Sequence, residues 1–163
     1  MALDFTNFAR IFSVAMLLMA AATSVAYADD DDDDYKFNVN NATWKSECGA
    51  CHVAYPPGLL PAESWRAIMS GLARHFGSDA SLDAASADEI TAFLEKNADT
   101  GKHKLSDKPL LRITETRRFK SEHSEVAARH WKDPRVKSRA NCGACHTTAD
   151  SGDFSEDNVK IPR

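Results

Sequence analysis

The chain has 163 residues, and its 20 basic and 24 acidic side chains give a net charge of −4. This balance excludes a strongly basic nucleic-acid-binding domain. All four cysteines lie in two identical Cys-Gly-Ala-Cys-His motifs, at residues 48–52 and 142–146, so no cysteine remains for a structural disulfide.

The first 28 residues have the layout of a secretory signal peptide. A short polar start precedes an apolar run at residues 11–22, and Ala-Tyr-Ala at residues 26–28 forms a cleavage site. The alternative is a retained membrane anchor, but the run is shorter than the about 20 residues that a span requires. We therefore predict that residues 1–28 are removed and that the protein is exported to the periplasm of a bacterium.

Six consecutive aspartates follow at residues 29–34. Like charges in such a run repel one another and stay solvated, so the run is predicted to be a disordered tail. The remaining residues, 35–163, carry a net charge of +2, and residues 112–139 hold nine Lys or Arg against four acids. This basic stretch could steer an acidic partner; a solvated helix face is the alternative.

The two cysteine motifs predict covalently attached haem. Two thiols separated by two residues can add to the vinyl groups of one haem, and the following histidine can bind its iron. A zinc site would not need that histidine, and its cysteine pairs would lie closer together. A thioredoxin-like pair would need a βαβ context, which is not visible. We predict two haem c groups, attached through Cys48, Cys51, Cys142 and Cys145, with His52 and His146 as iron ligands.

Each motif lies in a short segment, predicted as a first haem domain at residues 35–105 and a second at residues 106–163. Segments of this size are close to the lower limit for a domain with its own core. We expect each haem to supply the apolar centre, and the apoprotein to be poorly folded.

The first domain is predicted to be helical. Asn41 can cap a short helix that enters the first motif, and Tyr-Pro-Pro-Gly at residues 55–58 predicts a turn. Apolar residues at helical spacing then predict a helix over residues 63–76, closed by Gly77. These residues are Trp65, Ile68, Met69, Leu72 and Phe76.

A third helix is predicted over residues 87–97. It opens with a Ser-Ala-Asp-Glu capping box at residues 86–89, and its apolar face contains Ile90, Phe93 and Leu94. Residues 100–109 have the composition of a polar linker.

The second domain is predicted to be smaller and less regular. A helix is expected over residues 117–131 and a short helix, capped by Ser138, at the second motif. Residues 147–163 show no core pattern and are expected to be irregular chain over the haem. Since no strand pattern occurs, the fold class is mainly α: a class I-like cytochrome c domain followed by an irregular, haem-wrapped helical domain.

Each iron needs a sixth ligand, and a methionine there raises the reduction potential whereas a histidine leaves it lower. The predicted mature chain has one methionine, Met69, so at most one haem can use methionine. For haem 1 the candidates are His75 and Met69, which a continuous helix would point in different directions. For haem 2 they are His123 and His130, seven residues apart and so on one helix face. A further histidine, His103, lies in the linker.

Three stretches resemble the small bacterial dihaem cytochromes c of the DHC type. They are WKSECGACHVAYPPGLLPAESWRAIMSGLARHFGSDASL, RITETRRFKSEHSEV and VKSRANCGACHTTADSGDFSEDNVKIP. The resemblance implies bis-histidine ligation at both haems, with His52 paired to His75 and His146 paired to His123. It also implies electron transfer from a membrane cytochrome b to a small haem protein that binds oxygen.

If both haems are bis-histidine, no coordination position is open to a substrate, and the protein is an electron carrier rather than an enzyme. The rival hypothesis is a haem enzyme or gas-binding sensor with one open iron. The histidine supply argues against it, because there are enough candidates to fill both sixth positions.

Overall fold

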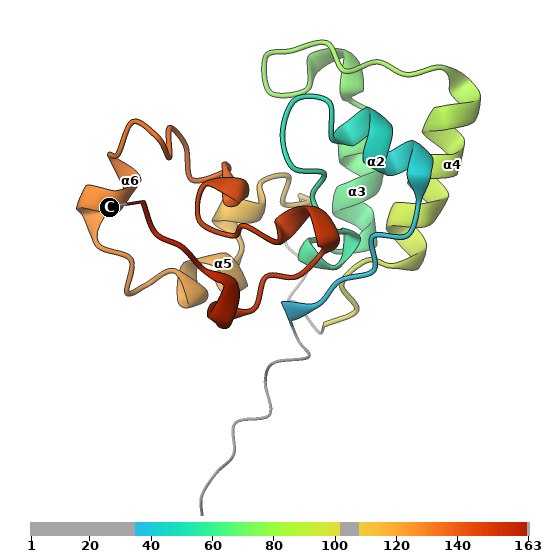
Figure 1. The fold of residues 1–163 in the computed structure, drawn as a ribbon. Helices are drawn as coiled ribbons and strands as arrows, with labels where there is room; N and C mark the ends of the chain where they lie inside the picture. Colours follow the sequence, from blue (N-terminus) through green and yellow to red (C-terminus); the bar gives the residue numbers. More distant parts are fainter. Residues whose placement is uncertain (1–34, 102–107, 163) are drawn as a thin grey trace, which may run out of the picture. The chain divides into compact units, whose positions relative to one another are not determined.

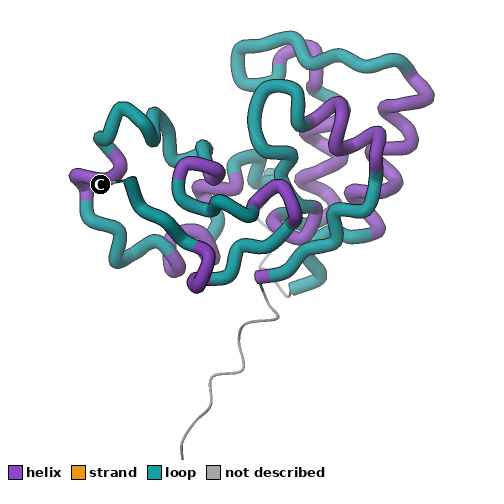
Figure 2. Tube along the Cα trace, viewed as in Figure 1, coloured by secondary structure: helices purple, strands orange, loops and turns teal. Residues whose placement is uncertain are grey.

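Helices and turns make up the computed structural model, which describes residues 35–101 and 108–162 (Figure 1). The predicted signal peptide, the aspartate run and His103 lie outside the described residues. Within the described ranges β-structure is limited to isolated bridges, and Figure 2 shows only helix and loop there. The predicted fold class, mainly α, is confirmed. In the same ranges, no helix has both the length and the apolar character needed to cross a membrane.

Helix α2 (Ala42–Cys48) leads directly into the first motif. Its N-cap is Asn41, whose side-chain oxygen accepts a hydrogen bond from the backbone N–H of Trp44 at 2.6 Å. This satisfies one of the N–H groups that a helix start leaves unpaired. The predicted cap is confirmed, and the helix ends on the first attachment cysteine.

Helix α3 (Ala62–Met69) is much shorter than the predicted helix over residues 63–76. It ends at Ser70, whose hydroxyl donates to the carbonyl of Ala67 at 3.0 Å, and Gly71 follows with its low helix propensity. The chain continues as the 3₁₀ turn η3 (Leu72–Arg74). Met69 and His75 therefore do not share a helix, and the expected angle between them does not apply.

Helix α4 (Ala84–Lys96) begins three residues before the predicted start. Its N-cap is Asp83, which accepts from the backbone N–H of Ser86 at 3.0 Å. The predicted capping box is wrong, because Glu89 does not return to the helix start. Its carboxylate instead accepts from the Asn41 amide at 3.0 Å and the Thr43 hydroxyl at 3.1 Å, which ties α4 to α2.

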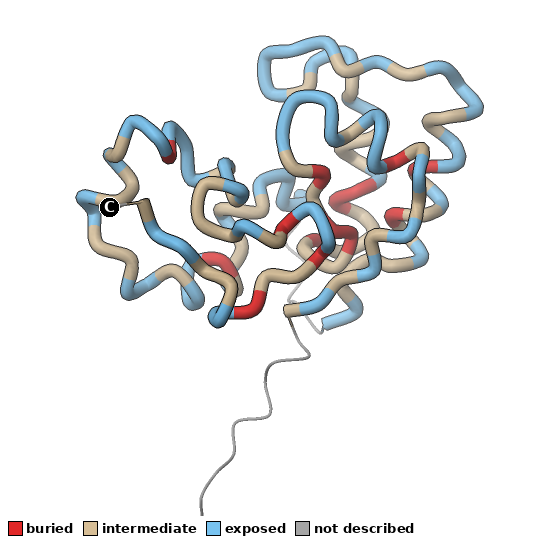
Figure 3. Tube along the Cα trace, in the orientation of Figure 1, coloured by how far each residue is buried: buried red, intermediate tan, exposed pale blue. Residues whose placement is uncertain are grey.

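Helices α2, α3 and α4 meet in a hydrophobic core. Figure 3 shows the buried positions gathering there. The indole N–H of Trp65 donates to the carbonyl of Pro57, at the start of the 3₁₀ turn η2 (Pro57–Leu59), at 2.7 Å. This leaves no unpaired polar atom on the Trp65 ring. The buried members of this cluster are Trp44, Ala54, Leu60, Trp65, Ile90 and Leu94.

The predicted helix over residues 117–131 is interrupted. Helix α5 (Arg117–Glu122), preceded by the 3₁₀ turn η4 (Ile113–Glu115), stops at His123, and helix α6 (Ala128–Trp131) starts after an extended residue, Ala127. Serine and β-branched valine, which occur in the interruption, are weak helix formers. Because the helix is interrupted, His123 and His130 belong to separate elements and do not share a helix face.

The second motif is not on an α-helix. Cys142–Ala144 forms the 3₁₀ turn η5, and Ser138 does not cap it, since its hydroxyl accepts from the N–H of Ala140 at 3.1 Å. Lys137 has a positive φ of 61°, which turns the chain before the motif. Two further 3₁₀ turns, η6 (Ala149–Ser151) and η7 (Glu156–Asn158), are the only helical pieces in residues 147–162. The expected irregular chain is confirmed there.

The start of the described chain pairs with its end. The N–H of Phe37 donates to the carbonyl of Gly152 at 2.9 Å, and the N–H of Phe154 donates to the carbonyl of Tyr35 at 2.9 Å. The rings of Phe37 and Phe154 meet in a T-shaped contact with centroids 5.7 Å apart. Both described ranges belong to one compact unit. The boundary predicted between residues 105 and 106 stays a prediction.

This pairing predicts that Gly152→Ala destabilises the protein. Gly152 has a φ of +80°, and an added Cβ would lie 2.6 Å from the carbonyl oxygen of Phe37 and 2.8 Å from Cγ1 of Val39. The left-handed backbone alone costs about 1–3 kcal/mol for a non-glycine residue. We expect at least this loss in the free energy of unfolding, measured by denaturant titration. Gly71→Ala is the control, because its Cβ would lie at an ordinary 3.5 Å from the nearest atom.

Candidate functional site

At least one thiol in each motif has a raised pKa. Burial, with a contribution from the charge of Glu47, raises the pKa of Cys48 to about 11. Burial likewise raises the pKa of Cys142 to about 11. Zinc-binding and redox-active cysteines are thiolates with lowered pKa values. In the described ranges no cluster of three or more His, Cys, Asp or Glu could hold a metal ion. The raised pKa values of Cys48 and Cys142 differ from those of zinc-bound or redox-active cysteines.

The first motif histidine faces a second histidine. The rings of His52 and His75 have centroids 6.3 Å apart and planes 21° from parallel. His75 reaches this place from the turn after η3, where its own N–H donates to the carbonyl of Leu72 at 3.2 Å. Met69, the other candidate for haem 1, ends α3 and packs against the core cluster. The structure therefore brings His75 opposite His52.

The second motif repeats this arrangement with a different ring orientation. The rings of His146 and His123 have centroids 6.0 Å apart, with planes 67° apart. His146 is anchored through its N–H, which donates to the carbonyl of Cys142 at 2.8 Å. His123 is the C-cap of α5, where its N–H donates to the carbonyl of Phe119 at 3.1 Å.

Both separations fit a metal between the rings. A histidine nitrogen lies about 2 Å from a first-row metal and its ring centre roughly 1 Å further, so two imidazoles that held one metal from opposite sides would have ring centroids about 6 Å apart. The measured 6.3 Å and 6.0 Å match this spacing. Burial, followed by the charge of His52, lowers the pKa of His75, and burial, followed by the charge of His123, lowers the pKa of His146. Neutral imidazoles, which metal binding requires, are thereby favoured.

In His52 and in His123, a hydrogen bond to one ring nitrogen leaves the other ring nitrogen available to coordinate a metal. Nδ1 of His52 lies 2.7 Å from the carbonyl oxygen of Val53, and Nδ1 of His123 lies 2.9 Å from that of Phe119. Because a carbonyl oxygen only accepts, Nδ1 must carry the hydrogen in each bond, and Nε2 keeps its lone pair. Nδ1 of His146 is buried and has no hydrogen-bond partner within the described part of the chain.

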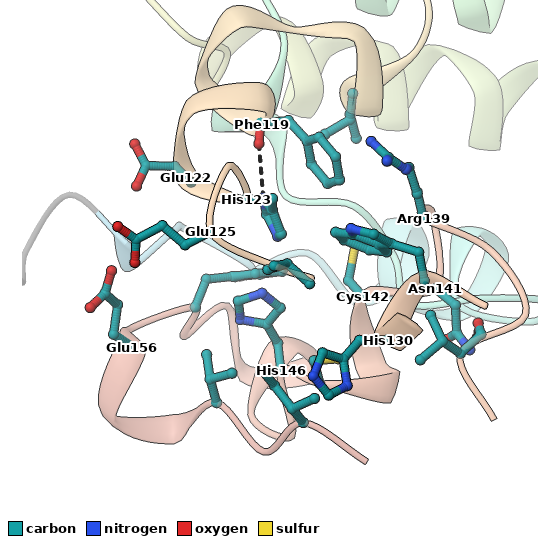
Figure 4. A pocket seen from close by; sticks show the side chains of 18 of the residues that line it. Phe119, Glu122, His123, Glu125, His130, Arg139, Asn141, Cys142, His146 and Glu156 are labelled. Carbon is teal, nitrogen blue, oxygen red and sulfur yellow. Dashed lines mark hydrogen bonds between the residues drawn. The ribbon is translucent and has the colours of Figure 1, made fainter. Parts of the chain in front are cut away.

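A cavity of about 610 Å³ lies at the second motif. Figure 4 shows His123, His146 and Cys142 among its lining side chains, with His130 at the same pocket. Its volume is in the range of ligand and cofactor pockets. His130, the other candidate for haem 2, comes from α6 and lines this cavity too. The residues at both motifs fit haem; which histidines bind iron stays a prediction.

Aromatic residues that the sequence analysis did not single out surround the histidine rings. Tyr55 stacks on His52 with centroids 4.5 Å apart, and Phe119 stacks on His123 at 4.1 Å. Phe119 precedes His123 by four residues, one helical turn, and that spacing was a usable signal. Trp131 approaches His123 and Phe154 approaches His146, each from eight residues further along the chain and across an interruption in helical structure.

Comparison with known proteins identifies the family of this chain. A sequence model of the family described as dihaem cytochrome c matches residues 44–154. No match was found among curated protein sequences.

Solved structures of similar proteins exist. The chain is 42% identical to a diheme cytochrome c from Rhodobacter sphaeroides, with a TM-score of 0.66, over 72% of this chain and 99% of that one. It is 41% identical to a diheme cytochrome type c from Shewanella baltica, with a TM-score of 0.66, over 75% of this chain and 93% of that one. The chain therefore belongs to the dihaem cytochrome c family and carries two covalently attached haem c groups.

Proposed function

We propose that this protein is a periplasmic electron carrier with two low-potential, bis-histidine haems. In this proposal it relays electrons from a membrane cytochrome b to a small haem protein that binds oxygen. Family membership implies electron transfer. The ligands, potentials, partners and location are the parts that we add to it.

The observation that carries the proposal is the pairing of histidine rings at both motifs. His75 stands 6.3 Å from His52, and His123 stands 6.0 Å from His146. When bound, haem c supplies the one-electron iron couple. With a histidine on each side, the chain leaves no coordination position for a substrate or gas, which suits transfer of electrons alone.

Low potentials follow from the same pairing. Methionine ligation raises the potential of a haem relative to bis-histidine ligation. Met69 is the one methionine of the described residues, and it packs against the first core cluster. Two histidine-only sites would therefore both lie at the low end of haem reduction potentials, which suits transfer from a membrane cytochrome b to another haem protein.

The proposed partners and location rest on other features. The first 28 residues predict export. Arg117, Lys120 and Arg129 are exposed cations, and Arg129 and Glu125 both line the cavity at the second motif. An acidic redox partner could be steered to this region by charge, at a rate that falls with salt.

Carbon monoxide tests the ligation on which this function depends. The ferrous wild-type protein should show no rapid, stoichiometric binding in its visible spectrum, because both sixth positions are filled. His75→Ala and His123→Ala should each open one site and bind about one carbon monoxide per chain.

Matched controls exist at both sites. Met69→Leu and His130→Ala change the two other candidate ligands and should leave the spectrum in carbon monoxide unchanged. Rapid stoichiometric binding by the wild type would contradict the carrier proposal and favour an enzyme or sensor. An opened site in His130→Ala but not in His123→Ala would reverse the assignment at haem 2.

A further inference from the structure

A tight turn directly follows His75. The N–H of Ser78 donates to the carbonyl of His75 at 3.0 Å, which closes a four-residue turn. Its two central residues both have positive φ, 50° at Phe76 and 103° at Gly77. Two positive central φ values define a type I′ turn.

Phenylalanine is a poor choice for the first central position of such a turn. Type I′ turns strongly prefer Asn-Gly, Asp-Gly or Gly-Gly, because the left-handed conformation is unfavourable for residues with bulky side chains. Gly77 meets this preference and Phe76 does not. Burial does not compensate, since Phe76 is 49% exposed. A strained residue that packing does not explain points to a function.

The Phe76 ring contacts both His75 and a cation. It makes a T-shaped contact with the His75 ring, with centroids 4.9 Å apart and planes at 66°. The guanidinium carbon of Arg112 lies 4.3 Å from the centre of the Phe76 ring. The cation attracts the electron-rich ring face, so Arg112 holds the aromatic ring in the orientation that contacts His75.

In the part of the chain that the structure describes, His75, like His146, lacks the Nδ1 hydrogen bond to a backbone carbonyl that orients His52 and His123. His52 and His123 each have Nδ1 on a backbone carbonyl, at 2.7 Å and 2.9 Å. Within residues 35–101 and 108–162, the His75 ring has no hydrogen-bond partner. Its ring plane is therefore set by packing, and the Phe76 ring is the aromatic neighbour beside it in the chain.

We propose that Phe76 is a positioning residue that fixes the ring plane of His75 and so sets the electronic structure of haem 1. The inference rests on the proposed function, in which His75 is an iron ligand. An imidazole donates π electrons at right angles to its plane. Nearly parallel rings, 21° apart at His52 and His75, would donate to one orbital of a bound iron, whereas rings 67° apart at the second motif would donate to two. The two haems should therefore give different signals.

Electron paramagnetic resonance of the ferric protein measures this difference. The wild type should show two low-spin signals, a rhombic one from haem 1 and one with a large maximal g value from haem 2. Phe76→Asn removes the ring and supplies a residue that the turn prefers, so folding should be retained. The rhombic signal should shift or broaden, while the signal of haem 2 stays in place.

Cyanide entry gives a second readout. An external ligand can bind ferric haem 1 only after His75 leaves. Loss of a partner that orients a metal ligand typically weakens metal binding by roughly 10- to 100-fold. Cyanide should therefore bind at about half of the haem at least tenfold faster in Phe76→Asn. Phe76→Tyr keeps the ring and should keep the wild-type signals and rate.

Leu110→Asn is the matched control, because Leu110 is a similarly exposed apolar residue at 38%. Unchanged signals and cyanide rate in Phe76→Asn would overturn the inference, as would an equal shift in Leu110→Asn. The proposed function fails separately, through His75→Ala: if that variant opens no site to carbon monoxide, His75 is not the ligand. If it opens a site while Phe76→Asn behaves as wild type, only the role of Phe76 is refuted.

Discussion

Replacing both cysteines of the second motif, Cys142→Ala with Cys145→Ala, should lower the covalent haem content from two to one per chain and leave residues 108–162 without a stable fold. The reason is the composition of that region. Helices α5 and α6 are far shorter than the ~12–15 residues at which an isolated helix becomes even marginally stable. Phe119 and Val136 are buried beside the cavity of about 610 Å³, whose centre the cofactor would fill. Without it, these side chains lose their packing partner.

Two measurements check this result. Haem that survives extraction with acidified organic solvent, counted by its pyridine spectrum, gives the covalent content. Limited proteolysis followed by mass spectrometry shows where the chain becomes accessible. Cuts should concentrate in residues 108–162, because cleavage follows the population of locally unfolded chain. A variant with one haem and wild-type protease resistance throughout would contradict the expectation.

The reciprocal variant, Cys48→Ala with Cys51→Ala, is the matched control. It should also lose one haem, but the cluster around Ile90 and Leu94 remains as a core independent of the cofactor. Proteolysis of residues 35–101 should therefore be slower than that of residues 108–162 in the first variant. Equal sensitivity would mean that both regions depend on haem to the same degree.

Trp44→Ala should be the most destabilising core substitution, at about 3–5 kcal/mol in the free energy of unfolding. Trp44 is 2% exposed and packs on Phe93 with ring centroids 5.3 Å apart. Truncation removes a large apolar surface and leaves a cavity between α2 and α4. Hydrogen bonds to Glu89 hold these two helices together, so the helices cannot easily move inward to fill the cavity.

Denaturant titration of the holoprotein, followed by far-ultraviolet circular dichroism, measures this loss. The midpoint should fall while the slope stays near that of wild type, which shows a change in stability rather than in the denatured state. Leu110→Ala, at a residue 38% exposed, should stay within about 0.5 kcal/mol of wild type. A loss in Trp44→Ala no greater than in this control would mean that Trp44 is not part of a packed core.

Local signals predicted the fold where they were strong. The Asn41 cap and the apolar face of α4 were both recognisable, since a short-range hydrogen bond and a helical repeat are written in adjacent residues. Prediction failed where propensity was weak. The expected helix over residues 63–76 ends at Met69, and the one over residues 117–131 is interrupted after Glu122. At the first break apolar spacing continued to Leu72 and Phe76, while Ser70 and Gly71 favoured a turn.

Those breaks decide where the candidate ligands lie. A continuous helix would have carried Met69 and His75 together, and likewise His123 and His130. The interruption after α3 brings His75 opposite His52, and the end of α5 brings His123 opposite His146. Residue types alone had left the sixth ligand of each haem open. Once a helix is broken, sequence spacing no longer shows which side chain lies close to the motif histidine.

The covalent chemistry needed no tertiary structure. Two thiols two residues apart with an adjacent histidine are a local arrangement, so both attachment sites could be read directly from residues 48–52 and 142–146. Tertiary structure decided which histidine lies opposite each motif histidine and how its ring is oriented. The ring planes lie 21° apart at one motif and 67° apart at the other, among tertiary contacts such as Arg112 on Phe76. These contacts join residues that are distant in the chain, and only packing in three dimensions can bring them together.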